Sequence, residues 1–301
     1  MPTTRARTVK IGGLKVEVTL DRVAAERIKG AWGVRSLVKN KQAYPLVGDE
    51  PMLNGTRLED IDWYHTIDLG DGISTPGFLD HRPQLDSYRL PESLDGLRCL
   101  DVATFDGFWA FEMEKRGAAE VIGIDVHSRA DCDYPRNFET EYLGWKAPHE
   151  PFPVKGMGFA YARRALGSRV QRKVLSVYEL SPETVGTFDF VFMSDILLHL
   201  RDPFRAIENV FRVLRPGGRA IIADAYDPAL DTEELRLTTR WRLLLDDYSG
   251  CHWWLPSPSV LHWMIHSAHF TDIQEVGRLV LPTKFDVPVD KVIFHARRAT
   301  A

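Results

Sequence analysis

Disulfide chemistry and membrane insertion have little support in this sequence of 301 residues. Three cysteines are present, Cys99, Cys132 and Cys251, which are widely separated and odd in number. Such a pattern indicates neither a disulfide framework nor a zinc motif, and we expect reduced thiols in a cytoplasmic protein. No apolar stretch approaches the roughly 20 residues that span a bilayer, and no apolar core follows the basic N-terminus as it would in a secretory signal. We therefore expect no membrane partner.

An excess of basic charge is also missing. Lysine and arginine number 38 against 42 aspartate and glutamate residues, so the formal net charge is −4. This balance lacks the basic character typical of nucleic-acid-binding proteins, and we do not expect nucleic acid as the partner. Histidines and carboxylates show no spacing that indicates a divalent-metal site, so we expect no metal. With 44% hydrophobic and 27% charged residues, the chain can bury one large core with a smaller appended unit.

What the sequence does contain is a strand, a tight turn, a helix and a second strand in close succession. Residues 97–112 read as the first three elements, and residues 121–125 follow as a strand that ends in an acid. A doubly wound sheet builds a nucleoside pocket from elements in this order. The turn keeps one glycine, Gly107, and places Asp106 where a dinucleotide phosphate would sit. Repulsion between that carboxylate and a phosphate would cost on the order of a few kcal/mol of binding free energy. A cationic adenosyl ligand therefore fits better than NAD or FAD.

Two further sequence blocks are considered together with residues 97–125. They read FDFVFMSDILLHLRDP over residues 188–203 and VLRPGGRAIIADAYDP over residues 213–228. With residues 97–125 they resemble the class I S-adenosylmethionine-dependent methyltransferases. The resemblance implies an α/β, Rossmann-like fold with a mostly parallel seven-stranded sheet, helices on both faces and S-adenosylmethionine as cofactor. Ala103 and Phe105 stand where that family most often has glycine, which narrows the turn.

We expect two parts in the chain. They are an N-terminal helical extension and lid over residues 1–94 and a methyltransferase domain over 95–301, with substrate-side insertions at 127–155 and 229–258. Apolar residues at helical spacing in 20–32 indicate an amphipathic helix that would pack on the domain or on a second subunit, giving a homodimer. Residues 60–82 combine turn residues with large aromatics, which favours a lid over the ligands, a structural cap being the alternative.

Local patterns predict the remaining elements of the domain. Asp202 and Pro203 are a typical N-cap and first residue of a helix, and Gly117 a typical helix end. Helices are predicted over 108–116, 156–167, from 203, near 232–246 and over 258–268. Strands are predicted over 170–180, 187–193 and 219–224, with a final pair near 272–280 and 290–297 that the resemblance makes antiparallel.

Ligands of an open parallel sheet lie outside the carboxyl ends of its strands. Asp125 is placed there to accept hydrogen bonds from both ribose hydroxyls, the alternative being a cap on the next turn. Ser176, Val177 and Tyr178 would border the adenine, although Val177 could equally be a core residue. The predicted cofactor-binding residues are Trp63, Asp101, Ala103, Thr104, Phe105, Asp106, Gly107, Asp125, Val126, Ser176, Val177, Tyr178 and Ser194.

The predicted catalytic residues are His199, His65 and Asp195. Methyl transfer is an in-line displacement, so the enzyme mainly holds the nucleophile about 3 Å from the methyl carbon. Ser194 and Asp195 would face the sulfonium, and a hydroxyl acceptor would benefit from a base. Histidine titrates near neutrality, which makes His199 a candidate base and His65 its competitor, while each has a packing role as its alternative.

Within the resembled family, the segment WYHTIDLGDGISTPG over residues 63–77 is most similar to bacterial tRNA wobble-uridine carboxymethyltransferases. In those enzymes basic residues before the core receive a carboxylated cofactor and the RNA. This chain has acids there instead: Glu59, Asp60, Asp62, Asp68 and Asp71. Phosphate backbones require basic contacts, so a tRNA substrate is the second hypothesis.

The favoured hypothesis is O-methylation of a small molecule in specialised metabolism. A set of aromatic residues supports it, since together they could form a pocket for an apolar acceptor and for the sulfonium. The set is Trp63, Tyr64, Phe105, Trp109, Trp145, Trp253 and Trp254. A third hypothesis is a non-catalytic, cofactor-binding partner subunit, which the altered glycine turn would allow.

Overall fold

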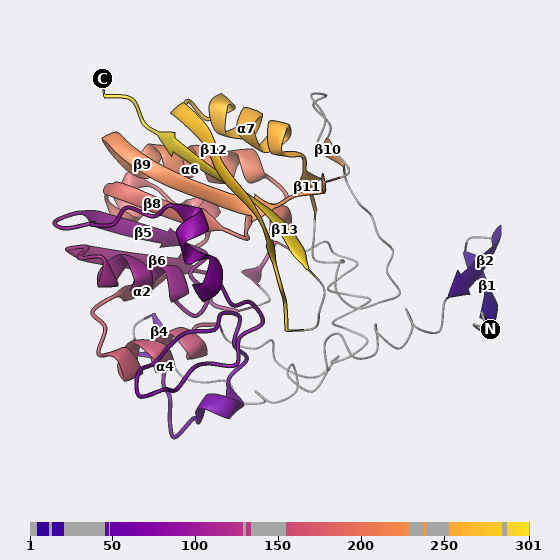
Figure 1. Cartoon of the computed structure of the whole chain (residues 1–301), viewed down its shortest axis with the longest axis horizontal. Coiled ribbons are helices and arrows are strands. Elements are labelled where there is room, and N and C mark those ends of the chain that lie inside the picture. Colours follow the sequence, from indigo (N-terminus) through magenta and orange to yellow (C-terminus); the bar gives the residue numbers. More distant parts are fainter. Residues whose placement is uncertain are drawn as a thin grey trace.

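The computed structural model describes residues 5–11, 14–20, 46–47, 49–128, 131–133, 155–228, 237–238, 253–284 and 288–300. Its main sheet consists of β5 (Arg98–Val102), β6 (Glu120–Asp125), β7 (Gln171–Val174), β8 (Phe188–Ser194), β9 (Leu214–Ala225), β12 (Thr271–Leu281) and β13 (Val289–Arg297). The strand order is β12-β13-β9-β8-β5-β6-β7 (Figure 1). β5 to β9 pair in parallel, whereas β13 is antiparallel to both β9 and β12. The predicted Rossmann-like α/β fold is confirmed.

The helices confirm several local predictions. Those that pack on the sheet are α2 (Phe108–Lys115), α4 (Met157–Leu166), α5 (Pro182–Val185), α6 (Pro203–Val213) and α7 (Pro258–Ser267). Short 3₁₀ helices are η1 (Leu58–Asp60), η2 (Arg82–Tyr88), η5 (Val177–Glu179) and η6 (Leu197–His199). α6 begins as expected, because the Asp202 side chain accepts the Arg205 N–H at 3.1 Å and proline occupies the first helical position.

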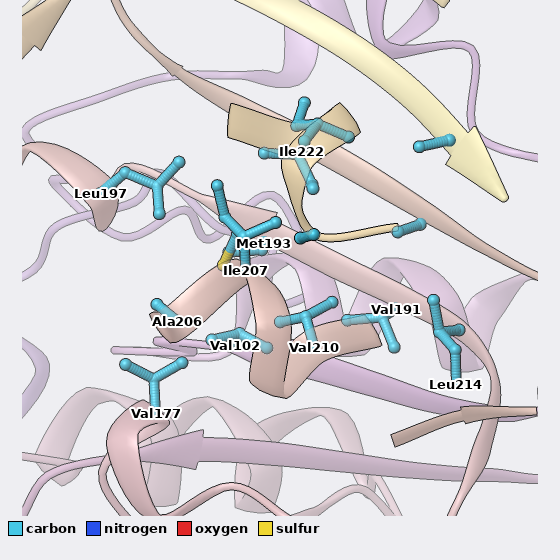
Figure 2. Close-up of a cluster of buried hydrophobic side chains, with 14 of the residues drawn as sticks. Val102, Val177, Val191, Met193, Leu197, Ala206, Ile207, Val210, Leu214 and Ile222 are labelled. Atoms are coloured by element: carbon cyan, nitrogen blue, oxygen red, sulfur yellow. The ribbon is translucent and has the colours of Figure 1, made fainter. Parts of the chain in front are cut away.

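Side chains alternate across the sheet and form two apolar cores, one on each face. On β8, Val191 and Met193 belong to the core that α6 and α7 cover, part of which is drawn in Figure 2. Phe190 and Phe192 of the same strand belong to the core that includes residues of α2 and α4. Both faces of the sheet are therefore covered, and the ends of the strands are the places where a ligand can bind.

Two predicted elements need correction. The strand predicted over 170–180 ends at Val174, because the Ser176 side chain accepts the Tyr178 N–H at 3.2 Å and starts η5. Within the helix predicted near 232–246, the structure describes β10 (Leu237–Thr238). Its residues pair antiparallel with β11 (Leu255–Pro256), so inter-strand hydrogen bonding replaces the helix there.

The N-terminal part contains a hairpin that we did not predict. β1 (Arg5–Ile11) and β2 (Leu14–Leu20) pair antiparallel, and β3 (Leu46–Val47) pairs with β4 (Glu50–Pro51). The helix predicted over residues 20–32 lies outside the described residues except for its first residue, which ends β2. Most of the two predicted insertions lie outside them too. No helix in the described ranges is long and apolar enough to cross a membrane.

Candidate active site

The turn that follows β5 has an unusual backbone. Ala103, Phe105 and Gly107 have φ angles of 62°, 48° and 92°. Left-handed φ values are uncommon for residues other than glycine and persist where neighbouring contacts hold them. Thr104 makes such a contact, because its side chain packs directly on Gly123 of β6. A Cβ atom added to Gly123 would lie only 2.7 Å from Thr104 Oγ1, so a larger residue would not fit there. The turn is thus packed against β6, although it lacks two glycines that the resembled family most often has.

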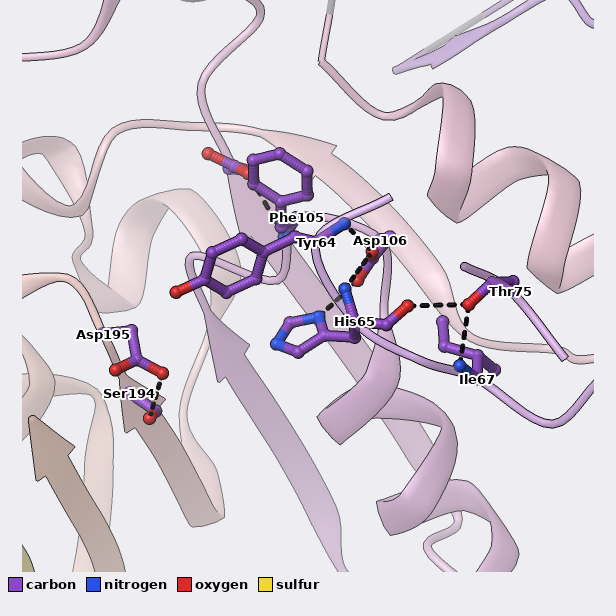
Figure 3. Close-up of polar contacts among 9 residues, drawn as sticks. Tyr64, His65, Ile67, Thr75, Phe105, Asp106, Ser194 and Asp195 are labelled. Carbon is purple, nitrogen blue, oxygen red and sulfur yellow. Dashed lines mark hydrogen bonds and ion pairs between the residues drawn. The ribbon is translucent and has the colours of Figure 1, made fainter. Parts of the chain in front are cut away.

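Asp106 is buried and faces residues 60–82, which we call the cap segment. Its carboxylate accepts the Tyr64 N–H at 2.9 Å and the His65 N–H at 2.8 Å, and pairs with His65 Nδ1 (Figure 3). The Thr75 hydroxyl donates to the His65 carbonyl at 2.7 Å and accepts the Ile67 N–H at 2.8 Å. These bonds fix the cap segment to the turn after β5. All the polar groups that contact the Asp106 carboxylate here belong to the cap segment. Asp106 therefore fixes the position of the cap segment.

Asp125 ends β6 and is also buried. Its Oδ1 accepts the Val126 N–H at 2.8 Å and a hydrogen bond from Lys155 Nζ at 2.7 Å, and its Oδ2 accepts the Phe105 N–H at 3.2 Å. The Lys155 ammonium also lies 4.9 Å from the centroid of the Phe105 ring. Lys155 was not among the predicted site residues. It follows the polar insertion after β6, where the sequence offers no periodic pattern that would place it.

Asp101, on β5, is a buried carboxyl that lacks part of its hydrogen bonding. Its Oδ2 has no hydrogen-bond partner among the described residues, and the side chain is 1% exposed. Burial raises the pKa of Asp101 to about 7. Trp109 Nε1 is likewise buried without a partner in the described part, whereas the Thr104 side chain interacts with the Asp101 carboxyl and opposes the rise of its pKa. Unpaired polar atoms of this kind are uncommon in protein interiors and call for a ligand or a functional explanation.

The residues predicted to border the adenine are held by the protein's own contacts. Ser176 caps η5, and Val177 lies in the apolar core, which was its open alternative. The Tyr178 hydroxyl donates to Asp133 Oδ2 at 2.7 Å and accepts the Asp202 N–H at 3.0 Å. Burial raises the pKa of this phenol above its ordinary value. All three residues lie after β7, at the carboxyl edge of the sheet. Their contact with adenine stays a prediction.

Ser194 ends β8 and Asp195 follows it, and both contact a lysine that we did not predict. The Ser194 hydroxyl donates to Asp195 Oδ2 at 3.0 Å, Lys291 Nζ donates to Ser194 Oγ at 3.1 Å, and Lys291 pairs with Asp195 Oδ2. Asp224 is a second buried carboxyl in this cluster, accepting the Leu197 N–H at 2.7 Å. Burial, reinforced by the charge of Asp195, raises the pKa of Asp224 to about 7.

Two buried histidines lie beside the turn. The His65 and His81 rings have centroids 5.4 Å apart, and His81 Nδ1 lies 3.0 Å from the Tyr88 hydroxyl. Burial, together with the positive charge of Lys291 and a contribution from His65, lowers the pKa of His81 well below its usual value. His81 is therefore neutral near pH 7. His199 lies at the end of η6 and is half-buried.

The predicted aromatic set does not form one group. Trp63 and Trp109 are buried in the core that includes α2 and α4, with Trp63 Nε1 donating to the Leu58 carbonyl at 2.9 Å. Tyr64 and Phe105 are near each other, their ring centroids 5.2 Å apart. Trp253 and Trp254 both donate backbone N–H groups to the carbonyl of one residue of η6, and Trp145 lies outside the described residues. Among the described residues, no group of three metal-ligating side chains is close enough to hold an ion.

The methyltransferase-domain family model matches residues 80–275. This stretch contains the parallel strands β5 to β9, the turn after β5, Ser194 and Asp195, and it is more than half of the chain. The chain therefore belongs to this family of methyltransferases. The resemblance to S-adenosylmethionine-dependent methyltransferases found in the sequence is confirmed, and the predicted cofactor is the one that this class of enzymes uses.

Among curated proteins, the chain is similar to the tRNA U34 carboxymethyltransferase of Idiomarina loihiensis, with 24% identity over 62% of this chain and 49% of the relative. The protein of the same name from Trichlorobacter lovleyi is 29% identical over 44% of this chain and 33% of the relative. The predicted likeness to that branch is confirmed. The chain spans about half the length, or less, of these relatives.

Solved structures share the fold. The N-terminal domain of EvdMO1 with S-adenosylhomocysteine bound has a TM-score of 0.51 at 14% identity, covering 84% of this chain and 100% of that chain. The YcgJ protein of Bacillus subtilis has a TM-score of 0.50 at 15% identity, covering 73% and 99%. At this level of identity the likeness shows the fold alone.

Proposed function

We propose that the chain transfers a methyl group from S-adenosylmethionine to a hydroxyl of a small-molecule acceptor. The observation that carries this proposal is the grouping of three carboxyl groups at the carboxyl edge of the sheet, of which Asp101 and Asp125 are buried. Asp101, Asp125 and Asp195 lie at or just after the ends of three strands, β5, β6 and β8, of which β5 is the middle one. Such carboxylates stabilise a sulfonium and an ammonium, whereas they would repel the phosphates of a dinucleotide.

Asp125 and Asp101 are the residues that would hold the methyl donor. Two carboxylate oxygens allow Asp125 to accept from both ribose hydroxyls once Lys155 releases its Oδ1. The unpartnered Oδ2 of Asp101 lies beside the turn and fits a cationic methionine group, because a hydrogen-bond donor there would satisfy a buried orphan acceptor. When bound, the donor supplies the electrophilic methyl carbon.

His65 is our proposed base for the acceptor hydroxyl. Its Nδ1 pairs with Asp106, which fixes the ring and stabilises the imidazolium that forms when the opposite nitrogen takes a proton. The edge of the His65 ring opposite Asp106 is directed toward the side of the view on which Ser194 and Asp195 lie (Figure 3). His199 is the competing base, and it lies half-buried at the end of η6.

The charge of the cap segment favours a small acceptor over RNA. The segment and the residues just before it carry Glu59, Asp60, Asp62, Asp68 and Asp71. Two arginines at the borders of this acidic stretch form ion pairs with neighbouring acids, Arg57 with Asp60 and Arg82 with Asp80. A phosphate backbone is held by lysine and arginine, so this surface does not favour one.

A tRNA uridine is the second candidate acceptor. The observation in its favour is the similarity to proteins named tRNA U34 carboxymethyltransferase, which extends over 62% of this chain in one of them. The chain spans about half of that relative. A non-catalytic subunit is the third candidate.

The test is a methyl-transfer assay on the purified chain with phenols, hydroxy acids and total tRNA as acceptors. We expect methylation of a small hydroxyl compound and none of tRNA. In the active assay, His65→Gln should lower kcat by roughly 10²- to 10⁴-fold, the usual contribution of a general base, while His199→Gln should lower it by much less. Methylation of tRNA alone would overturn the acceptor assignment. Donor binding without any transfer would favour the non-catalytic subunit.

A further inference from the structure

Lys291 is a fully buried lysine on β13, a strand at the far side of the sheet from β6 and β7. It lies opposite Ala225 of β9 in the strand register, and its side chain is 0% exposed. The ammonium reaches Ser194 and Asp195 at the end of β8 and lies 5.8 Å from the ring centroid of Tyr88. A buried lysine requires paired and hydrogen-bonded surroundings, and here Asp195 and Ser194 provide them.

Stability does not account for this ion pair. Removing two charges from water costs several kcal/mol per ion, and apolar residues of similar volume often stabilise a fold as well or better. The surrounding strands are rich in apolar side chains that could fill the same volume, as Val292, Ile293 and Phe294 show on β13 itself. A functional role for the pair is therefore the better explanation.

The geometry at Asp195 indicates what that role is. Asp195 has a φ of 56°, and its N–H donates to the Ala223 carbonyl at 3.1 Å. Both hydrogen bonds to its carboxylate, from Lys291 and from Ser194, go to Oδ2. Oδ1 accepts none from the residues that the structure describes, and in Figure 3 it points away from Ser194. One oxygen is held and the other is left for a ligand.

We infer that Lys291 is a positioning residue for the proposed methyl transfer. By holding Oδ2 of Asp195, it directs Oδ1 toward the acceptor, where that oxygen accepts a hydrogen bond from a donor group of the acceptor other than the hydroxyl that His65 deprotonates. The positive charge of Lys291 also opposes the burial that raises the pKa of Asp224, a buried acid of the same cluster. This inference rests on the proposed function, and it makes Asp195 and Lys291 determinants of acceptor binding that leave the methyl donor largely unaffected.

The test is a double-mutant cycle with Asp195→Asn, Lys291→Met and the combined variant. If Lys291 acts through Asp195, each single variant should raise the acceptor KM or lower kcat so that kcat/KM falls about 10-fold or more, with the Kd for S-adenosylhomocysteine changed less than threefold. Adding Lys291→Met to Asp195→Asn should then cause no further loss. Lys115→Met, an exposed lysine on α2, is the matched control and should behave as wild type.

A second measurement applies without any acceptor. Each single variant leaves one buried charge unpaired, whereas the combined variant leaves neither, so the combined variant should unfold at a higher denaturant concentration than Lys291→Met alone. A further fivefold loss of kcat/KM in the combined variant, relative to Asp195→Asn, would overturn the inference. So would additive losses of stability. If wild type transfers no methyl group, the proposed function fails, while the stability cycle still decides whether Lys291 acts on Asp195.

Discussion

The two ends of the parallel strands carry ion pairs of opposite character. At the amino ends, Arg98 pairs with Glu120 and Arg215 with Asp189, and these side chains are 22% to 46% exposed. At the carboxyl ends, three pairs have exposures of 14% or less, namely His65 with Asp106, Lys155 with Asp125 and Lys291 with Asp195, while the pair of Arg201 with Asp133 is more exposed. All of these ion pairs lie within the residues that the structure describes.

The difference separates ion pairs that water reaches from ion pairs that the protein has largely removed from water. An exposed pair is screened by water and contributes little to stability. A buried pair loses hydration that its mutual attraction barely offsets, so it persists where its geometry is needed. The carboxyl edge is also where parallel sheets bind ligands. The buried ion pairs and the strand topology are independent observations, and both indicate a ligand-binding site at the carboxyl edge of the sheet.

Asp106→Ala should produce the largest change. The substitution leaves the N–H groups of Tyr64 and His65 and the His65 ring without their acceptor, all within a buried cluster. We expect a loss of about 3 kcal/mol or more in the free energy of unfolding, because each buried donor left without an acceptor costs about 1 to 3 kcal/mol. Urea denaturation measures it. A loss below 1 kcal/mol would mean that the cap segment is not held through this carboxylate.

Asp101→Asn should change the pH dependence of stability. The folded-state pKa of about 7 lies above the unfolded value near 4, so folding protects the proton and stability is lost as pH rises between these values. Asparagine does not titrate. The free energy of unfolding of the variant, relative to that of wild type, should therefore rise by up to about 1.4 kcal/mol per pH unit from pH 4 to 7 and stay constant above pH 7. Urea titrations at pH 5, 6, 7 and 8 test this. A constant difference across the series would contradict it.

Asp125→Ala should weaken donor binding without removing the fold. Loss of charged hydrogen bonds to the ribose is expected to cost about 1 to 3 kcal/mol of binding free energy for S-adenosylmethionine. Calorimetric titration gives the affinity, with Glu120→Ala at the amino end of the same strand as the control. Equal affinities of wild type and Asp125→Ala would end the assignment of Asp125 to the ribose.

Arg215→Ala should have the smallest effect. Its partner Asp189 also accepts the Arg98 N–H at 2.9 Å, so the carboxylate keeps a hydrogen bond after the substitution. Because the pair is partly exposed, we expect less than about 1 kcal/mol of destabilisation and no change in donor affinity. A loss as large as that of Asp106→Ala would erase the distinction between the two ends of the strands.

Local sequence signals predicted much of the fold. Asp202 and Pro203 mark the start of α6 because a capping side chain and a proline act within one turn. The antiparallel pair at the end of the chain followed from family resemblance rather than from periodicity. The hairpin over residues 5–20 was missed because short alternating strands at a terminus give a weaker signal than the apolar helix spacing that follows them.

The polar network of the site was predictable only in part. Asp125 and Asp195 end or follow recognisable strands, so their places on the sheet edge could be inferred. The pairing of Asp106 with His65 spans 41 residues, and that of Lys291 with Asp195 spans 96, so neither leaves a local pattern. A lysine in a strand ordinarily indicates a solvent-exposed position, and only the three-dimensional arrangement shows that Lys291 is buried.

Hydrogen exchange with and without S-adenosylhomocysteine tests the central contrast most directly. We predict that the ligand slows amide exchange in residues 101–107, around Asp125 and in residues 194–197, all at the carboxyl edge. The amino ends of the same strands, near Arg98, Glu120 and Asp189, should exchange at unchanged rates. Protection at the amino ends, or none at the carboxyl edge despite calorimetric binding, would contradict it.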